Sequence, residues 1–313
     1  MNVSIIIPNY NGESILKKNL PKVLESAENY SGGLAEILIS DDGSVDNSVK
    51  IIKEFIDKNK NSNVKISLLQ SSSNMGFSSN VNRGSDAAKY EILVLLNTDV
   101  SPHRNFLMPL VQNFEDGNVF AVGCMDESIE GGKVVLRGRG VGKWRKGFLV
   151  HKRGEVNKRN TLWAGGGSGA FRKNIWDRLG GMDPIYNPFY WDDIDLSYRA
   201  LKSGYQVVFE KDSIVRHEHE KGAIKSKYPE QKVKRIAYRN QFIFVWKNSD
   251  ISTLISHILW LPYNLLLTIL RLDFNFIWGF LHALRLSPKI LKSRRKTFSN
   301  FVKSDSEILN NIK

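Results

Sequence analysis

Four apolar runs of strand length, separated by segments with helical spacing, constrain the fold of this 313-residue chain most strongly. The runs are rich in β-branched side chains and cover residues 3–7, 36–39, 64–69 and 91–96. Continuous apolar runs of this kind are typical of strands buried on both faces. Residues 15–24 and 49–56, which lie between the runs, carry apolar side chains at helical intervals. This alternation predicts an α/β fold with a Rossmann-type parallel sheet and helices on both of its faces.

The residues that follow the four runs are the first candidates for a site, because parallel sheets bind ligands at the carboxyl ends of their strands. All four segments are polar or turn-forming: Pro8-Asn9-Tyr10-Asn11, Ser40-Asp41-Asp42-Gly43-Ser44, Ser73-Asn74-Met75-Gly76 and Asn97-Thr98-Asp99. Tyr10 could stack on a base, and a carboxylate of the second segment could accept a hydrogen bond from a pyrimidine N–H. A packed aromatic residue and ordinary strand-to-helix turn chemistry are the alternatives.

Two segments are candidates for a metal site. Asn97-Thr98-Asp99 places a carboxylate where a divalent cation could bridge it to a diphosphate, and oxygen ligands suit Mg²⁺ or Mn²⁺. A loop aspartate that caps the next helix is the alternative. His217-Glu218-His219 follows another apolar run, and its two histidines would share one face of a strand. A pair of surface histidines fits that spacing equally well.

The segment around Asp192 and Asp193 is a candidate for acid–base chemistry. These residues and Asp195 stand at the predicted start of a helix, where the helix dipole favours anions, so a charged first turn is the simplest interpretation. The preceding Asn187-Pro188-Phe189-Tyr190-Trp191 is too aromatic for a solvated loop, and adjacent carboxylates raise one another's pKa. This combination favours a general base.

The run Gly165-Gly166-Gly167-Ser168-Gly169-Ala170 formally matches the dinucleotide-binding pattern. That pattern requires a second strand that ends at an acid about twenty residues later. Residues 183–191 are instead aromatic and interrupted by proline. A glycine-lined substrate wall therefore fits better.

In their order along the chain these motifs resemble the inverting family 2 glycosyltransferases of GT-A fold, from residue 3 to about residue 217. The resemblance rests on residues 7–11, 40–48 and 74–84, on Asn97-Thr98-Asp99 and on the pair Asp192-Asp193. It implies a nucleotide-sugar donor, Mg²⁺ or Mn²⁺ as the cation, and a hydroxyl acceptor. It also implies a single displacement that inverts the anomeric configuration.

The resemblance assigns roles to individual residues. Asp99 would hold the cation together with His217, and Asp193 would be the base beside Asp192. Gly166, Gly167 and Trp191 would line the acceptor. The nucleotide would be bound by Pro8, Asn9, Tyr10, Asp41, Asp42, Asn74, Gly76 and Asn97. Asn97 stands where the family has its first metal carboxylate, and Asp192 stands where the family more often has glutamate, so the choice of base between Asp192 and Asp193 stays open.

The C-terminal third points to a membrane. Residues 251–270 contain no formally charged side chain and are about long enough to cross a hydrocarbon core of roughly 30 Å, although polar residues interrupt them. Basic residues without an acid follow a second apolar stretch: Arg285, Lys289, Lys292, Arg294, Arg295 and Lys296. We expect residues 251–296 to lie in the interface of an anionic membrane rather than to cross it, with a helical cap on the core as the alternative. Membrane contact would make the acceptor lipid-linked and the product a polysaccharide or glycolipid.

Charge and cysteine content bear on partners and location. The net charge of +13 implies an anionic partner. The single cysteine, Cys124, stands in an apolar run and predicts a buried thiol, which fits a reducing compartment. The first residues indicate a strand rather than a signal peptide. We therefore expect a cytoplasmic protein that is peripheral on the inner face of the cell membrane.

The same patterns predict a GT-A domain over residues 1–220 and a basic, amphipathic helical region over residues 221–313. Residues 1–100 would form the nucleotide-sugar half and residues 101–220 the acceptor half. A nucleotidyltransferase is an alternative, but the first loop offers one glycine and no lysine before Lys17. A basic nucleic-acid-binding protein is another alternative, and it leaves the ordered acidic clusters unexplained, so we expect no nucleic-acid partner.

Overall fold

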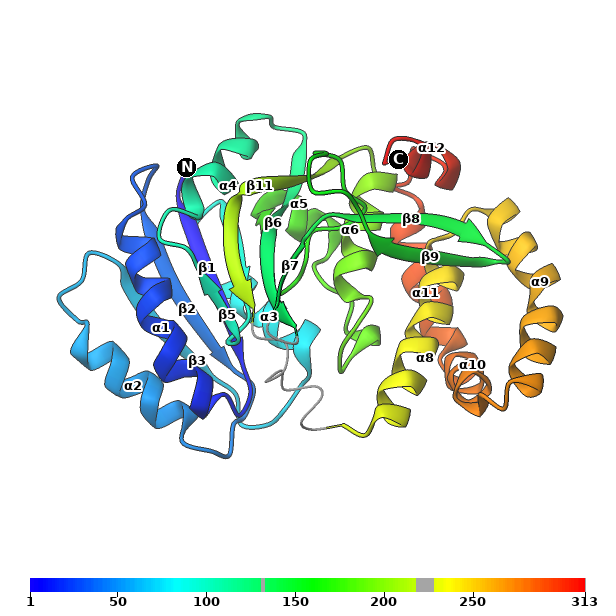
Figure 1. Ribbon diagram of the computed structural model, residues 1–313, viewed down its shortest axis with the longest axis horizontal. Coiled ribbons are helices and arrows are strands. Elements are labelled where there is room, and N and C mark those ends of the chain that lie inside the picture. The colour runs from blue at the N-terminus through cyan, green and yellow to red at the C-terminus, as the bar shows by residue number, and fades with distance from the viewer. Residues whose placement is uncertain (131–132, 218–227, 313) are drawn as a thin grey trace.

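The four predicted strands lie side by side in the computed structural model, which describes residues 1–130, 133–217 and 228–312 (Figure 1). Strand β1 (Val3–Asn9) lies between β2 (Ala35–Asp41) and β4 (Ile92–Leu96), and β3 (Lys65–Gln70) pairs with β2. All four strands are parallel, and Asn9 is in register with Asp41. The loops that follow β1 and β2 therefore leave the sheet at one level. The predicted α/β fold is confirmed.

Beyond β4 the sheet becomes mixed, which the irregular sequence of the second half did not indicate. Strand β10 (Ser168–Arg172) is antiparallel to both β4 and β6 (Val119–Glu130). Strand β11 (Gln206–His217) runs parallel to β6 and antiparallel to the edge strand β5 (Val100–Pro102), and β7 (Lys133–Arg137) pairs with β6. The end of β4 therefore lies beside the start of β10, and the end of β11 lies beside β5, which follows β4 in the chain.

Helices cover both faces of the sheet. On one face α1 (Glu13–Glu28), α2 (Ser48–Lys58) and α4 (Leu107–Gln112) pack on the side chains of Ile5 and Ile7. On the other face α3 (Phe77–Ala87), α5 (Lys173–Leu179) and α6 (Asp192–Lys202) pack around Ile6. Two short 3₁₀ helices complete this part, η1 (Asn113–Glu115) and η2 (Pro184–Tyr186). Cys124 is buried on β6, as predicted.

A third hydrophobic core joins the C-terminal helices to the hairpin of β8 (Gly140–Arg145) and β9 (Phe148–Arg153) and to α6. The helices are α8 (Glu230–Asn248), α9 (Ile251–Leu270), α10 (Phe274–Arg285), α11 (Ser287–Phe298) and α12 (Asp305–Asn310). In Figure 1 the hairpin extends from the sheet towards α9. The predicted domain boundary at residue 220 lies outside the described residues.

Buried ion pairs fasten α8 to α6. Asp195 on α6 is fully buried and accepts from Arg199 Nε at 2.7 Å and from Lys247 Nζ of α8 at 3.0 Å. Asn248 Nδ2 and the Tyr186 hydroxyl donate to its other oxygen at 2.7 and 2.8 Å. Burial opposes ionisation of Asp195, but the charges of Arg199 and Lys247 keep its pKa below the usual value. The carboxylate is therefore a charged, fully paired link between the two helices.

Lys247→Met should destabilise the protein strongly, because Asp183 and Asp195 would each lose a buried cationic partner. We expect a loss of about 3–5 kcal/mol in the free energy of unfolding, measured by urea denaturation. Lys234→Met on the same helix is the matched control, since Lys234 pairs with Glu230 in solvent. Equal unfolding midpoints for the two variants would contradict this role of Lys247.

Candidate active site

The first two loops form a connected polar cluster at the carboxyl ends of β1 and β2. Asn9 and Asp41 are buried, and Asn9 Nδ2 donates to Asp41 Oδ1 at 2.7 Å. Asp41 Oδ2 also accepts from the Ser44 backbone N–H at 3.0 Å. Among the predicted nucleotide-binding residues, Pro8 is buried in β1 and Tyr10 is half-buried directly after that strand. Asn9 and Asp41 therefore fix the shape of this loop pair.

Asp42 organises the third loop. Its two oxygens accept from the backbone N–H groups of Met75 and Gly76 at 2.8 and 2.9 Å, and the carboxylate is buried. Asn74, one residue earlier, is exposed. The structure therefore brings the segment 74–76 against the loop after β2.

Asp99 and His217 lie together, as the resemblance implied, because β5 and β11 are paired there. His217 Nε2 lies 3.2 Å from Asp99 Oδ2, and His217 Nδ1 lies 3.3 Å from Asp126 Oδ2 on β6. Burial opposes a charge on His217, but the hydrogen bonds to Asp126 and Asp99 outweigh it and raise its pKa to about 9. His219, the second histidine of that motif, lies outside the described residues.

The residues at this position suit a cation that arrives with phosphate. Asp99 and His217 both keep 15% of their side-chain surface exposed. In the part of the chain that the structure describes, no group of three histidine, cysteine or acidic side chains could hold a metal ion by itself. Mg²⁺-type sites commonly take one or two carboxylates from the protein and the remaining oxygens from phosphate and water. The donor set therefore fits a shared site rather than a closed protein cage.

Asp192 and Asp193 begin α6 but have different surroundings. Asp192 is only 4% exposed and accepts from Ser78 Oγ at 3.2 Å, whereas Asp193 is half-buried. Asp193 Oδ2 accepts from the Gly166 backbone N–H at 3.2 Å. Burial, and then the charge of Asp193, raise the pKa of Asp192 to about 7, and burial also raises the pKa of Asp193. Of the two carboxylates, Asp193 is the more accessible.

The glycine run connects the two acidic clusters. The Asn97 backbone N–H donates to the Gly167 carbonyl at 2.9 Å, and the neighbouring Gly166 contacts Asp193. A Cβ atom at Gly167 would lie 2.6 Å from Asn97 Nδ2, so a larger residue would displace the Asn97 side chain. The glycines thus link Asn97-Thr98-Asp99 to Asp193 through backbone hydrogen bonds.

The aromatic loop before α6 is held by residues that the sequence did not single out. Asn240 on α8 is fully buried, and its side-chain N–H₂ donates to the carbonyls of Tyr186, Phe189 and Tyr190 at 2.8 to 2.9 Å. From the same loop, Asn187 accepts from Ser78 N at 3.0 Å and donates to Met75 O at 2.9 Å. These contacts set the loop, and with it the start of α6, against the segment 74–78.

The predicted acceptor residue Trp191 lies in the third core, only 7% exposed, with its ring centroid 5.0 Å from that of Phe244. On its other side it contacts the ring of His151 at 5.1 Å, and His151 also contacts Trp163 at 5.4 Å. His151 is exposed and Trp163 is half-exposed. Of these three rings, those of His151 and Trp163 are therefore more exposed than that of Trp191.

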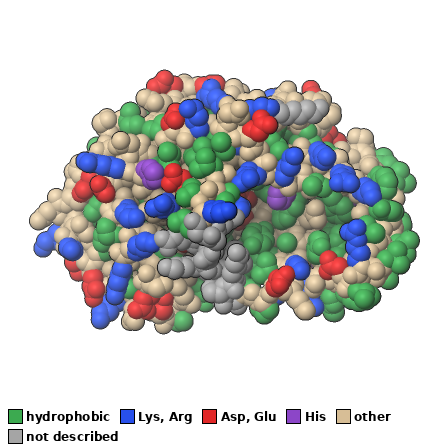
Figure 2. All heavy atoms as spheres, in the orientation of Figure 1, with side chains coloured by type: hydrophobic (Ala, Val, Ile, Leu, Met, Phe, Trp, Pro, Cys, Tyr) green, Lys and Arg blue, Asp and Glu red, His purple; other side chains and the backbone are tan. Residues whose placement is uncertain are grey.

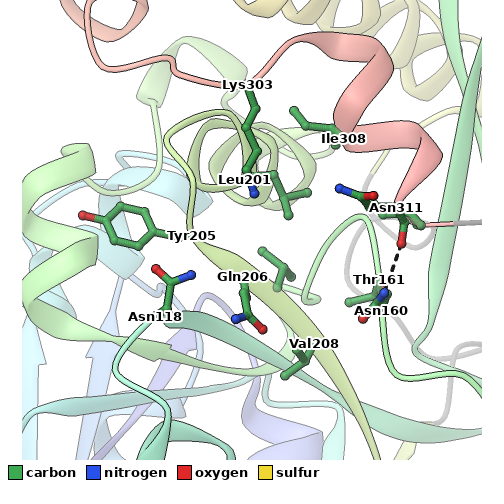
Figure 3. Close-up of a pocket in the computed structure, with 12 residues that line it drawn as sticks. Asn118, Asn160, Thr161, Leu201, Tyr205, Gln206, Val208, Lys303, Ile308 and Asn311 are labelled. Atoms are coloured by element: carbon green, nitrogen blue, oxygen red, sulfur yellow. Dashed lines mark hydrogen bonds between the residues drawn. The ribbon is translucent and has the colours of Figure 1, made fainter.

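A cavity of about 300 Å³ lies elsewhere, between the start of β11, the end of α6 and α12 (Figure 3). Asn118, Tyr205, Gln206 and Lys303 are among the residues that line it, and Asn160 donates to the Asn311 carbonyl at 3.0 Å on its wall. The residues that line it include none of the predicted site residues. The candidate site is therefore the carboxyl edge of the sheet, not this cavity.

Comparison with known proteins agrees with the motifs. A family model described as glycosyl transferase family 2 matches residues 4–179. The dolichol-phosphate mannosyltransferase of Pyrococcus furiosus is 28% identical over 135 residues, which are 43% of this chain and 35% of that protein. The alignments with the first curated relatives cover only about a third of their length, 32% and 35%.

Solved structures show the fold. GalNAc-T7, solved with UDP, GalNAc and Mn²⁺, has a TM-score of 0.61 at 19% identity, over 79% of this chain and 48% of that one. A mannosyltransferase from Pyrobaculum calidifontis, in complex with GDP-Man and Mn²⁺, has a TM-score of 0.58 at 15% identity, over 95% and 85% of the two chains. At such identities the likeness establishes the GT-A fold alone.

The raised pKa of Asp192 predicts how stability depends on pH. Between the ordinary aspartate pKa of 3.8 and about 7, the native state holds a proton that the unfolded chain releases, so stability falls as pH rises through this window. Asp192→Asn removes the buried charge. Its melting temperature should therefore exceed that of the wild type, and by several degrees more at pH 8 than at pH 5.

Asp195→Asn is the control from the same helix turn. It should lower the melting temperature at both pH values, because it leaves the buried Arg199 without its charged partner and removes one of the two carboxylates that pair with Lys247. A gain for Asp192→Asn that is the same at pH 5 and pH 8 would contradict the raised pKa.

Proposed function

Since the chain belongs to glycosyl transferase family 2, we propose that it transfers a sugar from a nucleotide-sugar donor to a hydroxyl group of a saccharide acceptor. The glycine run carries the proposal, because it contacts both the Asn97-Thr98-Asp99 segment and Asp193. A transferase needs a site for the departing diphosphate and a base for the acceptor at one location. The family match also favours transfer over the nucleotidyltransferase and nucleic-acid-binding alternatives.

The donor nucleotide would lie over the ends of β1 and β2. Asn9, Asp41 and Asp42 shape the loops there, and Tyr10 lies half-buried directly after β1, where it could stack on the base. The segment that includes Asn74 and Gly76 would close the other side. Structures of the same fold contain UDP or GDP-Man, which supports a nucleoside diphosphate as the donor's leaving group.

Asp99 and His217 would hold Mg²⁺ or Mn²⁺ next to the diphosphate. A bound cation would supply positive charge that stabilises the departing diphosphate. The Mn²⁺ complexes of the two solved structures support a divalent cation of this kind. For His217 to act as a ligand it must be unprotonated.

Asp193 would act as the general base of a single displacement. It takes the proton of the acceptor hydroxyl while that oxygen forms its bond to the anomeric carbon. The bond from this carbon to the diphosphate oxygen breaks on the opposite face, and the configuration inverts. The partial exposure of Asp193 and the burial of Asp192 behind it support Asp193 as the base, with Asp192 in a supporting role. A raised pKa suits a base that works near neutral pH.

The acceptor would lie along Gly166 and Gly167, with His151 and Trp163 next to them and Trp191 behind. Aromatic rings present apolar surface to sugar rings. The match to a dolichol-phosphate mannosyltransferase supports a lipid-linked acceptor. With such an acceptor the enzyme would work at a membrane surface, in keeping with the expected location at the inner face of the cell membrane.

Asp193→Asn should reduce kcat by about 10²–10⁴-fold, because the amide cannot take a proton from the acceptor. The measurement is nucleotide release from a panel of UDP- and GDP-sugars with Mn²⁺ and saccharide acceptors. Asp177→Asn is the control, since Asp177 is an exposed acid on α5 that pairs with Lys173. Equal activity of Asp193→Asn and the wild type would refute the base assignment.

Asp99→Asn should weaken the binding of Mn²⁺ in the presence of UDP or GDP at least tenfold, because it removes the charged oxygen ligand. Isothermal titration of the full chain measures this, and Asp212→Asn, an exposed acid on β11, is the control. An unchanged Mn²⁺ affinity would place the cation elsewhere.

A further inference from the structure

The helices α9 and α10 carry an apolar surface whose large side chains are exposed in the part of the chain that the structure describes, here called the C-terminal apolar face. It consists of large side chains four or seven residues apart on the outward side of each helix: Ile255, Leu259, Leu266 and Leu270 on α9, and Phe274 and Trp278 on α10. Leu259 and Leu270 are 74% and 71% exposed. In Figure 2 hydrophobic side chains gather at the end of the molecule that α9 occupies in Figure 1. A surface of large exposed apolar side chains that extends over two neighbouring helices marks an interaction site.

The opposite side of α9 is bonded to the tip of the β8–β9 hairpin. His257 is buried, its Nδ1 lies 2.8 Å from the Gly147 carbonyl oxygen, and Asn264 Nδ2 donates to the Lys146 carbonyl at 3.0 Å. Gly147 has φ of +80°, and a Cβ atom there would lie 2.7 Å from His257 Cα. A glycine is thus required for the tip to pack this closely on α9.

The contact between α9 and the hairpin tip limits how α9 can bind a bilayer. Among the described residues, Ile251–Leu270 is the one helix long and apolar enough to cross a membrane. A crossing helix must be surrounded by lipid or by apolar protein. On α9 one side is occupied by the tip of a hairpin that carries exposed cations at Lys143 and Arg145. The apolar side alone is free, which suits a helix that lies along the interface.

Basic and aromatic side chains border the C-terminal apolar face. Lys146 Nζ donates to the Tyr263 hydroxyl at 2.7 Å and lies over its ring, and Arg235 lies over the ring of Trp278. Further cations are exposed nearby in sequence at Arg271, Arg285 and Lys289. Trp, Tyr and basic residues around an apolar patch are the composition of a protein surface that binds an anionic membrane interface.

We propose that the C-terminal apolar face docks on an anionic lipid bilayer, with α9 and α10 lying in the headgroup region and the hairpin tip on the side of α9 away from the lipid. The docking does not depend on the transfer reaction, whereas the choice of a lipid-linked acceptor rests on the proposed function. The hairpin connects the two, because Gly147 contacts α9 while His151, four residues later, contacts Trp191 beside the acid pair.

The test is flotation of the full chain with vesicles of phosphatidylcholine mixed with phosphatidylglycerol, compared with phosphatidylcholine alone. The wild type should bind the mixed vesicles, and binding should weaken at high salt. Leu259→Glu/Leu270→Glu should reduce the partition coefficient more than tenfold, since each leucine would lose its transfer from water into the interface. The matched control is Leu34→Glu/Val302→Glu, two exposed apolar residues outside α9 and α10.

Several outcomes would overturn the proposal. One is equal vesicle binding by the two double variants, and another is binding that does not change with the phosphatidylglycerol content of the vesicles. A third is resistance of the bound protein to extraction at alkaline pH, which would indicate a crossing helix. A fourth is a dimer in sedimentation that Leu259→Glu/Leu270→Glu dissociates, without vesicle binding, which would make the face an interface between two copies.

The same samples separate this proposal from the proposed function. Nucleotide release with a water-soluble saccharide acceptor tests transfer without lipid. If transfer occurs while vesicle binding fails, only the docking is wrong. If the protein docks but uses no nucleotide sugar, the transfer reaction is wrong and the docking stands.

Discussion

Asp195 is the residue on which the arrangement of the molecule most depends. Its carboxylate lies inside α6, fully buried, and two cations from α6 and α8 meet on it. A buried charge is costly unless it is paired and hydrogen-bonded, so α8 can pack on α6 only where Lys247 reaches this carboxylate. Once α8 is fixed, Asn240 is in place to bind the three carbonyls of the loop that precedes the acid pair. A structural ion pair thus sets the geometry of the candidate site.

The first turn of α6 holds two kinds of carboxylate that a sequence cannot distinguish. Asp195 has cations within hydrogen-bond distance and a lowered pKa, whereas Asp192 has a serine hydroxyl, a like-charged neighbour and a raised pKa. The first stabilises the native state at neutral pH, and the second destabilises it. Active sites often contain residues that lower the stability of the native state beside others that raise it.

Much of the fold could be predicted because its signals are local. The apolar runs gave β1 to β4, and the rule that ligands lie at the carboxyl ends of parallel strands brought Asp41, Asp99 and the segment near Gly76 to one edge. The position of β10 between β4 and β6 could not be predicted, since an antiparallel strand inserted from a distance has no local signature. Asn240 was also missed. A polar residue in a basic helix is expected to face solvent, and the local sequence does not indicate that Asn240 is buried against three carbonyl groups. Asp126 was missed because its partner His217 is 91 residues away.

The β8–β9 hairpin fixes the distance between α9 and the acid pair. Four residues of extended chain separate Gly147, against α9, from His151, beside the acid pair, which corresponds to roughly 13 Å at the usual rise of a strand. If a bilayer binds at α9, the hairpin would fix the distance between the lipid and the acid pair. An acceptor hydroxyl close to the lipid anchor would not reach Asp193, and a hydroxyl at the end of a longer saccharide would extend beyond it. The length of acceptor that the protein accepts would then follow from the geometry of the hairpin rather than from the chemistry of any single contact.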